Sequence, residues 1–223
     1  MSAEQLPLDL GHSTSLEADD FLPAACNREA LAWLDRYPDW PAPALVLFGP
    51  EGCGKSHLAR IFAARSEART LDPEALPEPS ELRHRAARVL DPALPVRDEV
   101  GLLRLYNGLR EAGGHVLLTA RRPPAEWGVR LPDLASRRRS APAVAIGPPD
   151  DALLGAVLVK LFADLQVDVS GELIAYLVSR MERSCAAAHR IVRELDARSL
   201  RHKRPITVAL AREALGATVH DQD

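Results

Sequence analysis

Short, continuous apolar runs alternate with amphipathic segments over residues 21–149 of the chain. Such runs are typical of strands buried on both faces of a parallel sheet, whereas apolar residues that recur with helical spacing are typical of helices. The runs predict strands at 44–49, 87–91, 115–120 and 143–149, the last being equally consistent with an extended exit from the domain. The amphipathic segments predict helices at 27–37, 56–66 and 97–114, with a proline-containing loop at 70–80.

The pattern changes after Pro149, where only helical spacing is found. Four segments each open on Asp, Ser or Thr, which are preferred at helix N-caps, and they lie at 150–166, 170–181, 184–200 and 207–215. This order predicts an α/β fold: a parallel sheet with helices on both faces, followed by a small all-α domain. The predicted parts are a polar arm at 1–20, a sheet domain at 21–148 and a helical domain at 149–223.

Composition and charge narrow the class of protein. A chain of 223 residues suits one large domain, or a medium domain with a small one. The formal net charge of −3 argues against a surface built wholly for nucleic acid, but a local basic patch stays open. No apolar run is long enough to span a membrane, and the acidic N-terminus does not resemble a signal peptide. Three widely spaced cysteines, Cys26, Cys53 and Cys185, have no zinc-site spacing and favour a reducing, cytoplasmic location.

The segment GPEGCGKS, residues 49–56, matches the phosphate-binding pattern G-x-x-x-x-G-K-[ST] between a predicted strand and a predicted helix. Glycines allow the backbone to turn tightly around phosphate, and the following helix presents its positive N-terminal end. We expect Lys55 to meet the terminal phosphates and Ser56 to bind Mg²⁺. The predicted nucleotide-binding residues here are Gly49, Pro50, Gly52, Cys53, Gly54, Lys55, Ser56 and His57.

The acid that follows the second predicted strand is Asp91, which we expect to hold Mg²⁺ together with Ser56. Nucleotide hydrolysis usually requires a second acid directly after it, but the next residue is Pro92, which can neither orient water nor accept a proton. The next acids are Asp98 and Glu99. The sequence therefore predicts a site that binds nucleotide and hydrolyses it slowly or not at all.

A P-loop sheet domain followed by a helical lid resembles the AAA+ ATPases, and three segments are similar to the DnaA-related family within that class. The segment DDFLPAACNREALAWL resembles the adenine-pocket region of that family, and RLYNGLREAGGHVLLTARRPP resembles its helix and sensor strand. The segment LPDLASRRR, residues 131–139, resembles the stretch that carries the family's arginine finger. The resemblance covers about residues 17–215.

The resemblance implies roles for individual residues. Arg137 aligns with the arginine finger, which acts in trans on a partner's nucleotide, while Arg138 and Arg139 are interpreted as surface charges or as weak contacts to DNA phosphates. Phe21 and Asn27 are expected to line the adenine side of the pocket, with a core position as the alternative for Phe21.

Two family positions depart from the pattern. Thr119 stands at the sensor position, and it is followed by Ala120 and Arg121 where the family suggests an acid. Ala186 stands where the lid arginine is expected, so Arg190, one helical turn further along, is a candidate substitute. An ordinary surface role is the alternative for Arg190. Both departures favour a protein that works bound to ADP rather than one switched by ATP.

The N-terminal peptide QLPLDL, residues 5–10, resembles the hexapeptide with which bacterial proteins bind the DNA polymerase III sliding clamp. Gln5, Leu6, Leu8 and Leu10 are the expected contacts, and Pro7 would reduce the entropy lost when the peptide becomes ordered. Together with a sequence that stops after the lid, this peptide resembles the Hda-type regulatory subgroup of the DnaA-related family. The alternative is a leucine-containing tail without function.

The sequence thus predicts a DnaA-related AAA+ regulator that binds ADP (or ATP) with Mg²⁺, docks on the sliding clamp and promotes ATP hydrolysis by DnaA. Replication initiation would be limited as a result. An active AAA+ ATPase of the helicase-loader type is the main alternative. A P-loop kinase or other small-molecule enzyme is disfavoured, because no acceptor-binding segment is evident. No membrane partner is expected, and homo-oligomerisation stays open.

Overall fold

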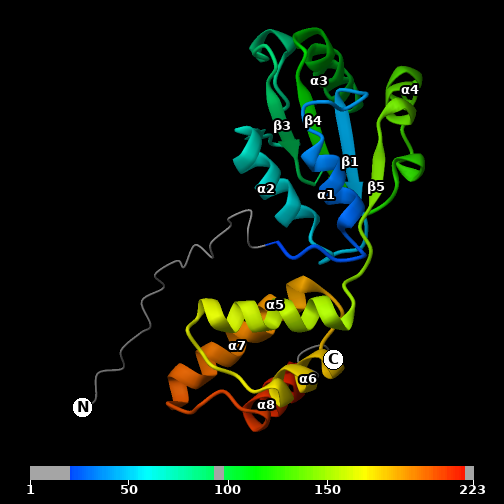
Figure 1. Ribbon diagram of the computed structural model, residues 1–223. Coiled ribbons are helices and arrows are strands. Elements are labelled where there is room, and N and C mark those ends of the chain that lie inside the picture. The colour runs from blue at the N-terminus through cyan, green and yellow to red at the C-terminus, as the bar shows by residue number, and fades with distance from the viewer. Residues whose placement is uncertain (1–20, 93–97, 219–223) are drawn as a thin grey trace.

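The computed structural model of the chain describes residues 21–92 and 98–218. These residues form a sheet domain and a helical lid, which lie one above the other (Figure 1). The five strands, all parallel, stand in the order β2-β3-β4-β1-β5, with β1 paired to β4 and β5 and β3 paired to β2 and β4. Their bounds are β1 Ala44–Phe48, β2 Arg69–Thr70, β3 Ala87–Leu90, β4 His115–Ala120 and β5 Ala143–Ala145.

The four predicted strands are confirmed, and β2 is an additional strand that the sequence did not predict. Its second residue, Thr70, falls at the start of the loop predicted at 70–80, and residues 71–78 of that loop belong to no helix or strand. Both residues of β2 are exposed, so no apolar run marks it in the sequence. Pairing of Arg69 with Arg88 and of Thr70 with Val89 creates this edge strand. A short 3₁₀ helix, η2 (Pro79–Glu81), follows within the same segment.

Alternation along β1 divides the sheet domain into two apolar layers. Leu45 and Leu47 pack on the side of α1 (Arg28–Asp35) and α2 (Lys55–Ser66). Ala44 and Val46 pack on the opposite side, against α3 (Glu99–Ala112) and α4 (Pro132–Ser140). Successive side chains of a strand point to opposite faces, so a strand that is apolar at every position needs helices on both sides.

Helix α4 follows the 3₁₀ helix η3 (Pro124–Glu126), and only one of its side chains, Leu134, is fully buried. The sequence pattern did not mark it as a helix because three consecutive arginines hide any amphipathic periodicity. Pro132 at the first helical position is a favourable start, since proline there loses no intrahelical hydrogen bond.

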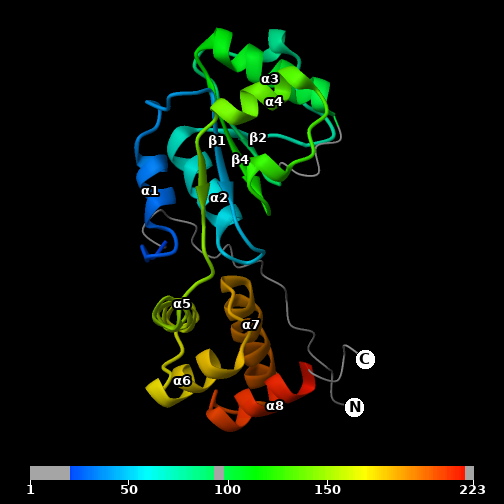
Figure 2. The same ribbon diagram turned by 90° about the vertical axis from the view of Figure 1, so that its right-hand side faces the viewer.

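The lid contains the four predicted helices, α5 (Asp151–Asp164), α6 (Gly171–Arg180), α7 (Cys185–His202) and α8 (Val208–Thr218). Figure 2 shows them grouped beneath the sheet domain. Asp150, Ser170 and Ser184 accept hydrogen bonds from the backbone of Leu153, Leu173 and Ala187, which confirms the predicted caps. The lid has its own core, built around residues that include Leu154, Leu158, Phe162, Leu177 and Leu195.

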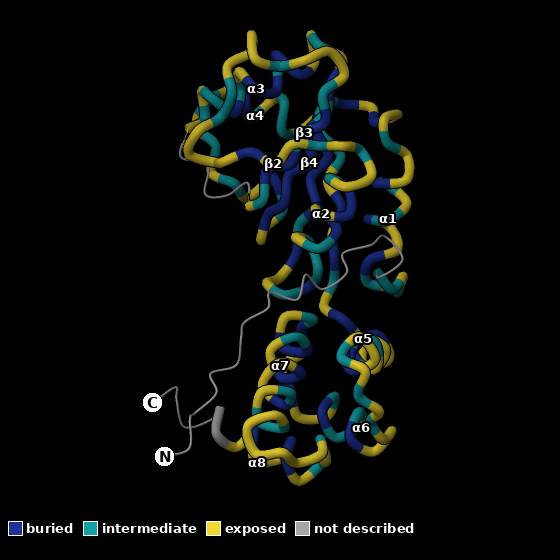
Figure 3. The backbone as a smooth tube through the Cα atoms, turned by 90° about the vertical axis from the view of Figure 1, so that its left-hand side faces the viewer, coloured by how far each residue is buried: buried dark blue, intermediate teal, exposed yellow. Residues whose placement is uncertain are grey.

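Buried residues concentrate in the strands and on the inner faces of the lid helices (Figure 3). The fold class predicted from the sequence is therefore confirmed: a parallel sheet covered by helices, followed by an all-α lid. Residues 146–150 connect β5 to α5, and the domain boundary near residue 148 stays a prediction. Among the described residues, no helix combines the length and apolar character needed to cross a membrane.

Candidate nucleotide site and arginine helix

The glycine-rich segment 49–54 joins β1 to α2 at the carboxyl edge of the sheet. Gly52 and Gly54 adopt left-handed backbone conformations, with φ of +74° and +104°. L residues with side chains are strained there, so glycine is required for this turn. Helix α2 begins at Lys55, and its N-cap residue is Gly54, which has no side chain to cap the first N–H groups. Its first N–H groups and its dipole are therefore suited to bind an anion.

Lys55 reaches back over the same loop. Its Nζ donates to the carbonyl oxygens of Gly49, at 2.9 Å, and of Pro50, at 2.6 Å, and it lies 3.6 Å from Sγ of Cys53. The ammonium group is thus held at the loop that would bind phosphate. Ser56, the second residue of α2, is exposed, as a metal-binding hydroxyl must be.

Asp91 and Thr119 meet at the carboxyl ends of the neighbouring strands β3 and β4. The hydroxyl of buried Thr119 donates a hydrogen bond to Oδ1 of Asp91. Among the described residues, no group of three or more His, Cys, Asp or Glu side chains could hold a metal alone. Mg²⁺ would therefore need phosphate oxygens in addition to Ser56 and Asp91, which offer the hard oxygen ligands it prefers.

Arg121, which follows β4, forms an ion pair with Glu51 of the phosphate loop at 2.8 Å. Both side chains are largely exposed, with 74% and 76% of their surface accessible. An exposed pair of this kind contributes little stability. The pair nevertheless holds the Arg121 guanidinium group beside the phosphate loop. Arg121 stands in the stretch after Thr119 where the family pattern suggests an acid.

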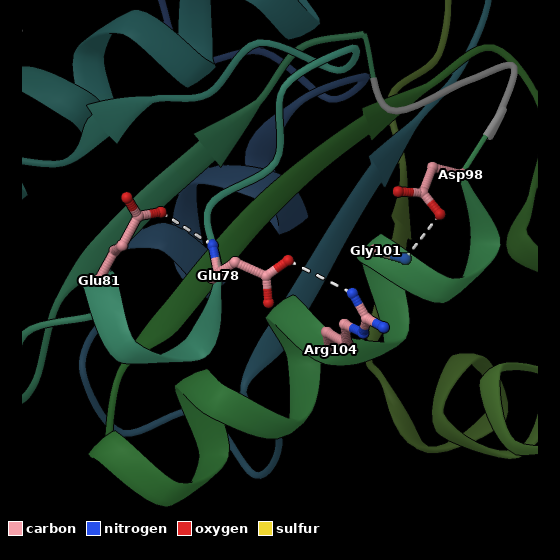
Figure 4. A network of polar contacts seen from close by, with 5 residues as sticks. All are labelled: Glu78, Glu81, Asp98, Gly101 and Arg104. Atoms are coloured by element: carbon pink, nitrogen blue, oxygen red, sulfur yellow. Dashed lines mark hydrogen bonds and ion pairs between the residues drawn. The ribbon is translucent and has the colours of Figure 1, made fainter.

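The two acids that follow Asp91 in the sequence are both bound to backbone amides. Asp98 caps α3 by accepting from the N–H of Gly101 at 2.7 Å, as Figure 4 shows. Glu99 accepts from the N–H groups of Arg130 and Leu131, and these hydrogen bonds lower the pKa of its carboxyl group. Both carboxylates thus hold backbone amides of α3 and of the segment before α4.

The same view shows how the segment before β3 is tied to α3. Arg104 of α3 contacts Glu78 at 3.3 Å, and Glu81 accepts from the backbone of Glu78 at 2.9 Å (Figure 4). The Arg104–Glu78 pair is exposed, so it fixes the course of this segment more than it adds stability.

Phe21 lies beside the phosphate loop, whereas Asn27 is the N-cap residue of α1. The Phe21 ring lies 5.5 Å from the His57 ring, and a Cβ placed on Gly54 would stand 3.7 Å from it. Asn27 is buried, and its amide accepts from the N–H of Ala24 and donates to the carbonyl of Leu22. Asn27 thus shapes the segment that follows Phe21, while contact of either residue with adenine stays a prediction.

The N-terminus of lid helix α7 rests directly on the phosphate loop. The N–H of Cys185 donates to the carbonyl of Gly52 at 3.0 Å. A Cβ placed on Gly52 would lie 2.6 Å from Cβ of Ser184 and 3.4 Å from Cβ of Ala186. Ala186, the position predicted to replace the lid arginine, therefore faces the loop.

Arg190, the predicted substitute for that arginine, pairs with Glu182 at 2.9 Å and is 61% exposed. Arg183 pairs with Asp151 on the neighbouring lid helix α5. The structure thus engages both guanidinium groups with carboxylates of the lid itself. The nucleotide-binding role assigned to Arg190 gains no support from this arrangement.

The three cysteines come close to one another around the loop, which their sequence positions did not suggest. Burial raises the pKa of the Cys185 thiol to about 11, and the nearby Cys26 and Cys53 add to the shift. The thiol of Cys26 also has a raised pKa, chiefly through burial. Because thiolates are the reactive form, these side chains behave as small apolar groups.

The arginine-rich helix α4 lies against α3. The guanidinium carbon of Arg137 stands 5.9 Å from the centre of the Tyr106 ring, a cation–π contact. Arg138 is half-buried and donates to the carbonyls of Pro124 and Ala125. Its interpretation as a free surface charge is therefore wrong, because its guanidinium group fastens α4 to η3. Arg139 is exposed, as predicted.

The predicted clamp-binding residues Gln5, Leu6, Leu8 and Leu10 lie outside the described residues. The sheet order, the glycine-rich loop between β1 and α2, and a helical lid whose α7 meets that loop define a P-loop fold of the AAA+ type.

Comparison with known proteins narrows this class. The family model of the Hda lid domain matches residues 156–215. The chain is 25% identical over 217 residues to the chromosomal replication initiator protein DnaA of Thermomicrobium roseum, with 83% of the chain and 45% of that protein covered. It thus spans about half the length of this relative. These matches make the chain similar to Hda in its lid and to DnaA over most of its length, and the structural neighbours below share its fold.

Solved structures share the fold at low identity. Domain III of Thermotoga maritima DnaA superposes with a TM-score of 0.75 at 15% identity, covering 92% of this chain and 97% of that one. AMPPCP-bound DnaA from Aquifex aeolicus gives 0.64 at 14% identity, covering 81% and 64%. The Thermotoga maritima RuvB branch migration motor gives 0.70 at 13% identity, covering 90% and 71%.

Proposed function

We propose that this protein is a cytoplasmic regulator of replication initiation that binds ADP with Mg²⁺ and presents Arg137 to ATP bound by DnaA. Hydrolysis would take place in the partner's site, and the product, ADP-bound DnaA, would no longer initiate. The observation that carries the proposal is the combination of a formed phosphate loop with two acidic side chains that are hydrogen-bonded to backbone amides. Gly52, Gly54 and Lys55 are arranged to bind phosphate, while Asp98 and Glu99 cap backbone amides.

The arrangement of the lid favours ADP over ATP in this proposal. Ala186 faces the phosphate loop in the position where an arginine could bind a terminal phosphate, and its side chain offers neither charge nor a hydrogen bond. Adenine nucleotide is supported by the relationship to DnaA, since the Aquifex aeolicus DnaA structure contains AMPPCP. Lys55 and the N-terminus of α2 would then neutralise the two remaining phosphates.

Arg137 would act by electrostatic stabilisation in trans. As phosphoryl transfer proceeds, charge spreads over the oxygens of the γ-phosphate, and a guanidinium group placed there lowers the barrier. In nucleotide hydrolases, such arginines contribute rate factors on the order of 10³–10⁵. The partner supplies the water and its own metal ion. This chain would supply a positive charge.

The peptide QLPLDL would bring this reaction to replicating DNA. An extended peptide fits an apolar groove on a partner through alternate side chains, so Leu8 and Leu10 suit the role of anchors and Gln5 that of a polar contact. Sliding clamp loaded on DNA would then concentrate the regulator where replication has begun.

The decisive experiment measures ATP hydrolysis by DnaA in the presence of DNA-loaded clamp and this protein. We expect Arg137→Ala to reduce the stimulated rate at least tenfold, a small part of the factor seen for arginine fingers. Arg139→Ala is the matched control, because Arg139 is an exposed arginine on the same helix. Equal stimulation by the wild type and Arg137→Ala would remove the assigned role.

A pull-down on sliding clamp tests the N-terminal peptide separately. The double variant Gln5→Ala/Leu10→Ala should lose clamp binding while it keeps nucleotide binding. Retained clamp binding would show that the peptide is not the docking element. Turnover of ATP by the isolated chain near 1 s⁻¹, a rate ordinary for enzymes, would instead favour the helicase-loader type of ATPase.

A further inference from the structure

Helix α4, which carries Arg137, is poorly held by apolar packing. Leu134 is its only fully buried side chain. A cavity of about 20 Å³ lies between α4, α3 and the sheet, and Tyr106, Leu134 and Arg137 belong to its lining. A gap of this kind removes dispersion contacts that would otherwise fix the helix. Polar contacts therefore add to this limited apolar packing in fixing the position of α4.

One set of these polar contacts comes from the first residue of α3. Oε2 of Glu99 accepts from the N–H of Leu131 at 2.7 Å and of Arg130 at 3.1 Å, and Oε1 accepts from Arg130 at 3.0 Å. Leu131 is the N-cap residue of α4, and its own side chain gives no capping bond. Glu99 therefore satisfies N–H groups at the entry to α4 from a different helix, and its charge strengthens these hydrogen bonds.

A second contact lies further along the same two helices. Arg137 covers the ring of Tyr106, which is buried in α3. Helix α3 thus holds α4 both at its beginning and under its arginine. Glu99 also follows closely after Asp91 in the sequence, so α3 leads from the nucleotide side of the sheet to the arginine helix.

We propose that Glu99 is a positioning residue for Arg137: its carboxylate fixes the start of α4 and thereby the place on the molecule from which Arg137 would reach a partner's nucleotide. This inference rests on the proposed function of Arg137. It gives Glu99 a task different from that of a catalytic base, and it explains why a half-buried acid on α3 is bound to the backbone of another segment.

The test compares Glu99→Ala, Glu99→Gln and Arg137→Ala in the clamp-dependent assay of ATP hydrolysis by DnaA. Two charge-assisted hydrogen bonds are lost in Glu99→Ala, so we expect the maximal stimulated rate to fall about tenfold. The concentration of regulator that gives half-maximal stimulation should stay within about twofold, because docking does not depend on Glu99. A glutamine carbonyl at the Oε2 position can accept from both amides, so Glu99→Gln should recover to within about threefold of the wild-type rate.

Asp98→Ala is the matched control. Asp98 is the adjacent acid at the same helix end, but its carboxylate caps Gly101 within α3 and does not bind α4. This variant should keep the wild-type stimulated rate. Each protein is first shown to bind ADP and to unfold cooperatively. Hydrogen exchange should be faster at the amides of Arg130 and Leu131 in Glu99→Ala alone, which reports on the contact itself.

The outcomes separate the two proposals. A normal rate in Arg137→Ala would overturn the proposed function and this inference with it. A low rate in Arg137→Ala combined with a normal rate in Glu99→Ala would overturn the positioning role alone. Equal losses in Glu99→Ala and Asp98→Ala, or no recovery in Glu99→Gln, would mean that Glu99 only stabilises the fold. A loss confined to Glu99→Ala and Arg137→Ala, with recovery in Glu99→Gln, is the expected result.

Discussion

Replacement of Gly52 by alanine tests whether contact between lid and phosphate loop is needed for nucleotide binding. The new Cβ would stand 2.6 Å from Cβ and 3.0 Å from Oγ of Ser184. These atoms belong to Ser184, the N-cap residue of α7, whose hydroxyl is held by the N–H of Ala187 in the first turn, so they are tied to the helix. The Cys185–Gly52 hydrogen bond, 3.0 Å long, would be disturbed as well. We therefore expect the lid to be displaced from the loop.

The expected free-energy cost of Gly52→Ala has two parts. The left-handed backbone at Gly52, φ +74°, costs alanine about 1–2 kcal/mol whatever the lid does. Overpacking against Ser184 costs a further ~1–3 kcal/mol, but only while the lid contacts the loop. If nucleotide requires the closed lid, this second part weakens ADP binding about 5- to 150-fold. Isothermal titration calorimetry with ADP measures this loss of affinity directly.

Two further variants separate the clash from backbone strain. Gly128→Ala is the matched control, because Gly128 has φ +63° and a Cβ there would meet nothing within 4 Å. Ser184→Gly removes the clashing atoms, and glycine at an N-cap costs only a few tenths of a kcal/mol. The double variant Gly52→Ala/Ser184→Gly should therefore recover most of the affinity. Our reasoning is refuted if Gly52→Ala binds ADP as tightly as Gly128→Ala, or if the double variant shows no recovery.

Three other predictions follow from individual side chains. Arg138→Ala should lower the free energy of unfolding, measured by urea denaturation, by about 1–3 kcal/mol through loss of its bonds to the carbonyls of Pro124 and Ala125, whereas exposed Arg139→Ala should change it by less than about 0.5 kcal/mol. Cys185, with a pKa of about 11, should react with iodoacetamide at pH 8 about a hundredfold more slowly in the native than in the unfolded chain, as followed by mass spectrometry. A rapid reaction would contradict its burial. The stabilisation from Glu99 should be complete above its ordinary pKa of 4.5 and lost as pH falls through its lower native pKa, so urea titrations of Glu99→Gln should lack this acid dependence.

The phosphate loop and most elements could be predicted because their signals are local. Buried strands appear as apolar runs, and Asp150, Ser170 and Ser184 mark the starts of lid helices by capping their own first turns. The exceptions lack such a signal. Strand β2 is two exposed residues that pair with β3, and α4 has one buried side chain among its arginines.

The individual roles of polar residues were harder to predict from the sequence. Glu99 and Arg138 are of residue types that are common on protein surfaces. Their partners are carbonyl or amide groups that no sequence pattern marks. Cys26, Cys53 and Cys185 come from three separate segments and lie near one another because α7 of the lid packs against the loop. A pattern search for local spacing could not have found them.

The amino-acid sequence by itself determined the class of fold and the position of the glycine-rich turn before Lys55, since both depend on neighbouring residues such as strand runs, helix caps and glycines. The tertiary structure decided which side chains are free to act. Asp98 and Glu99 are bound to amides, Arg138 to carbonyls, and Ala186 lies against Gly52. These assignments depend on contacts between residues far apart in the chain, and such contacts exist only after the sheet, the arginine helix and the lid have packed together.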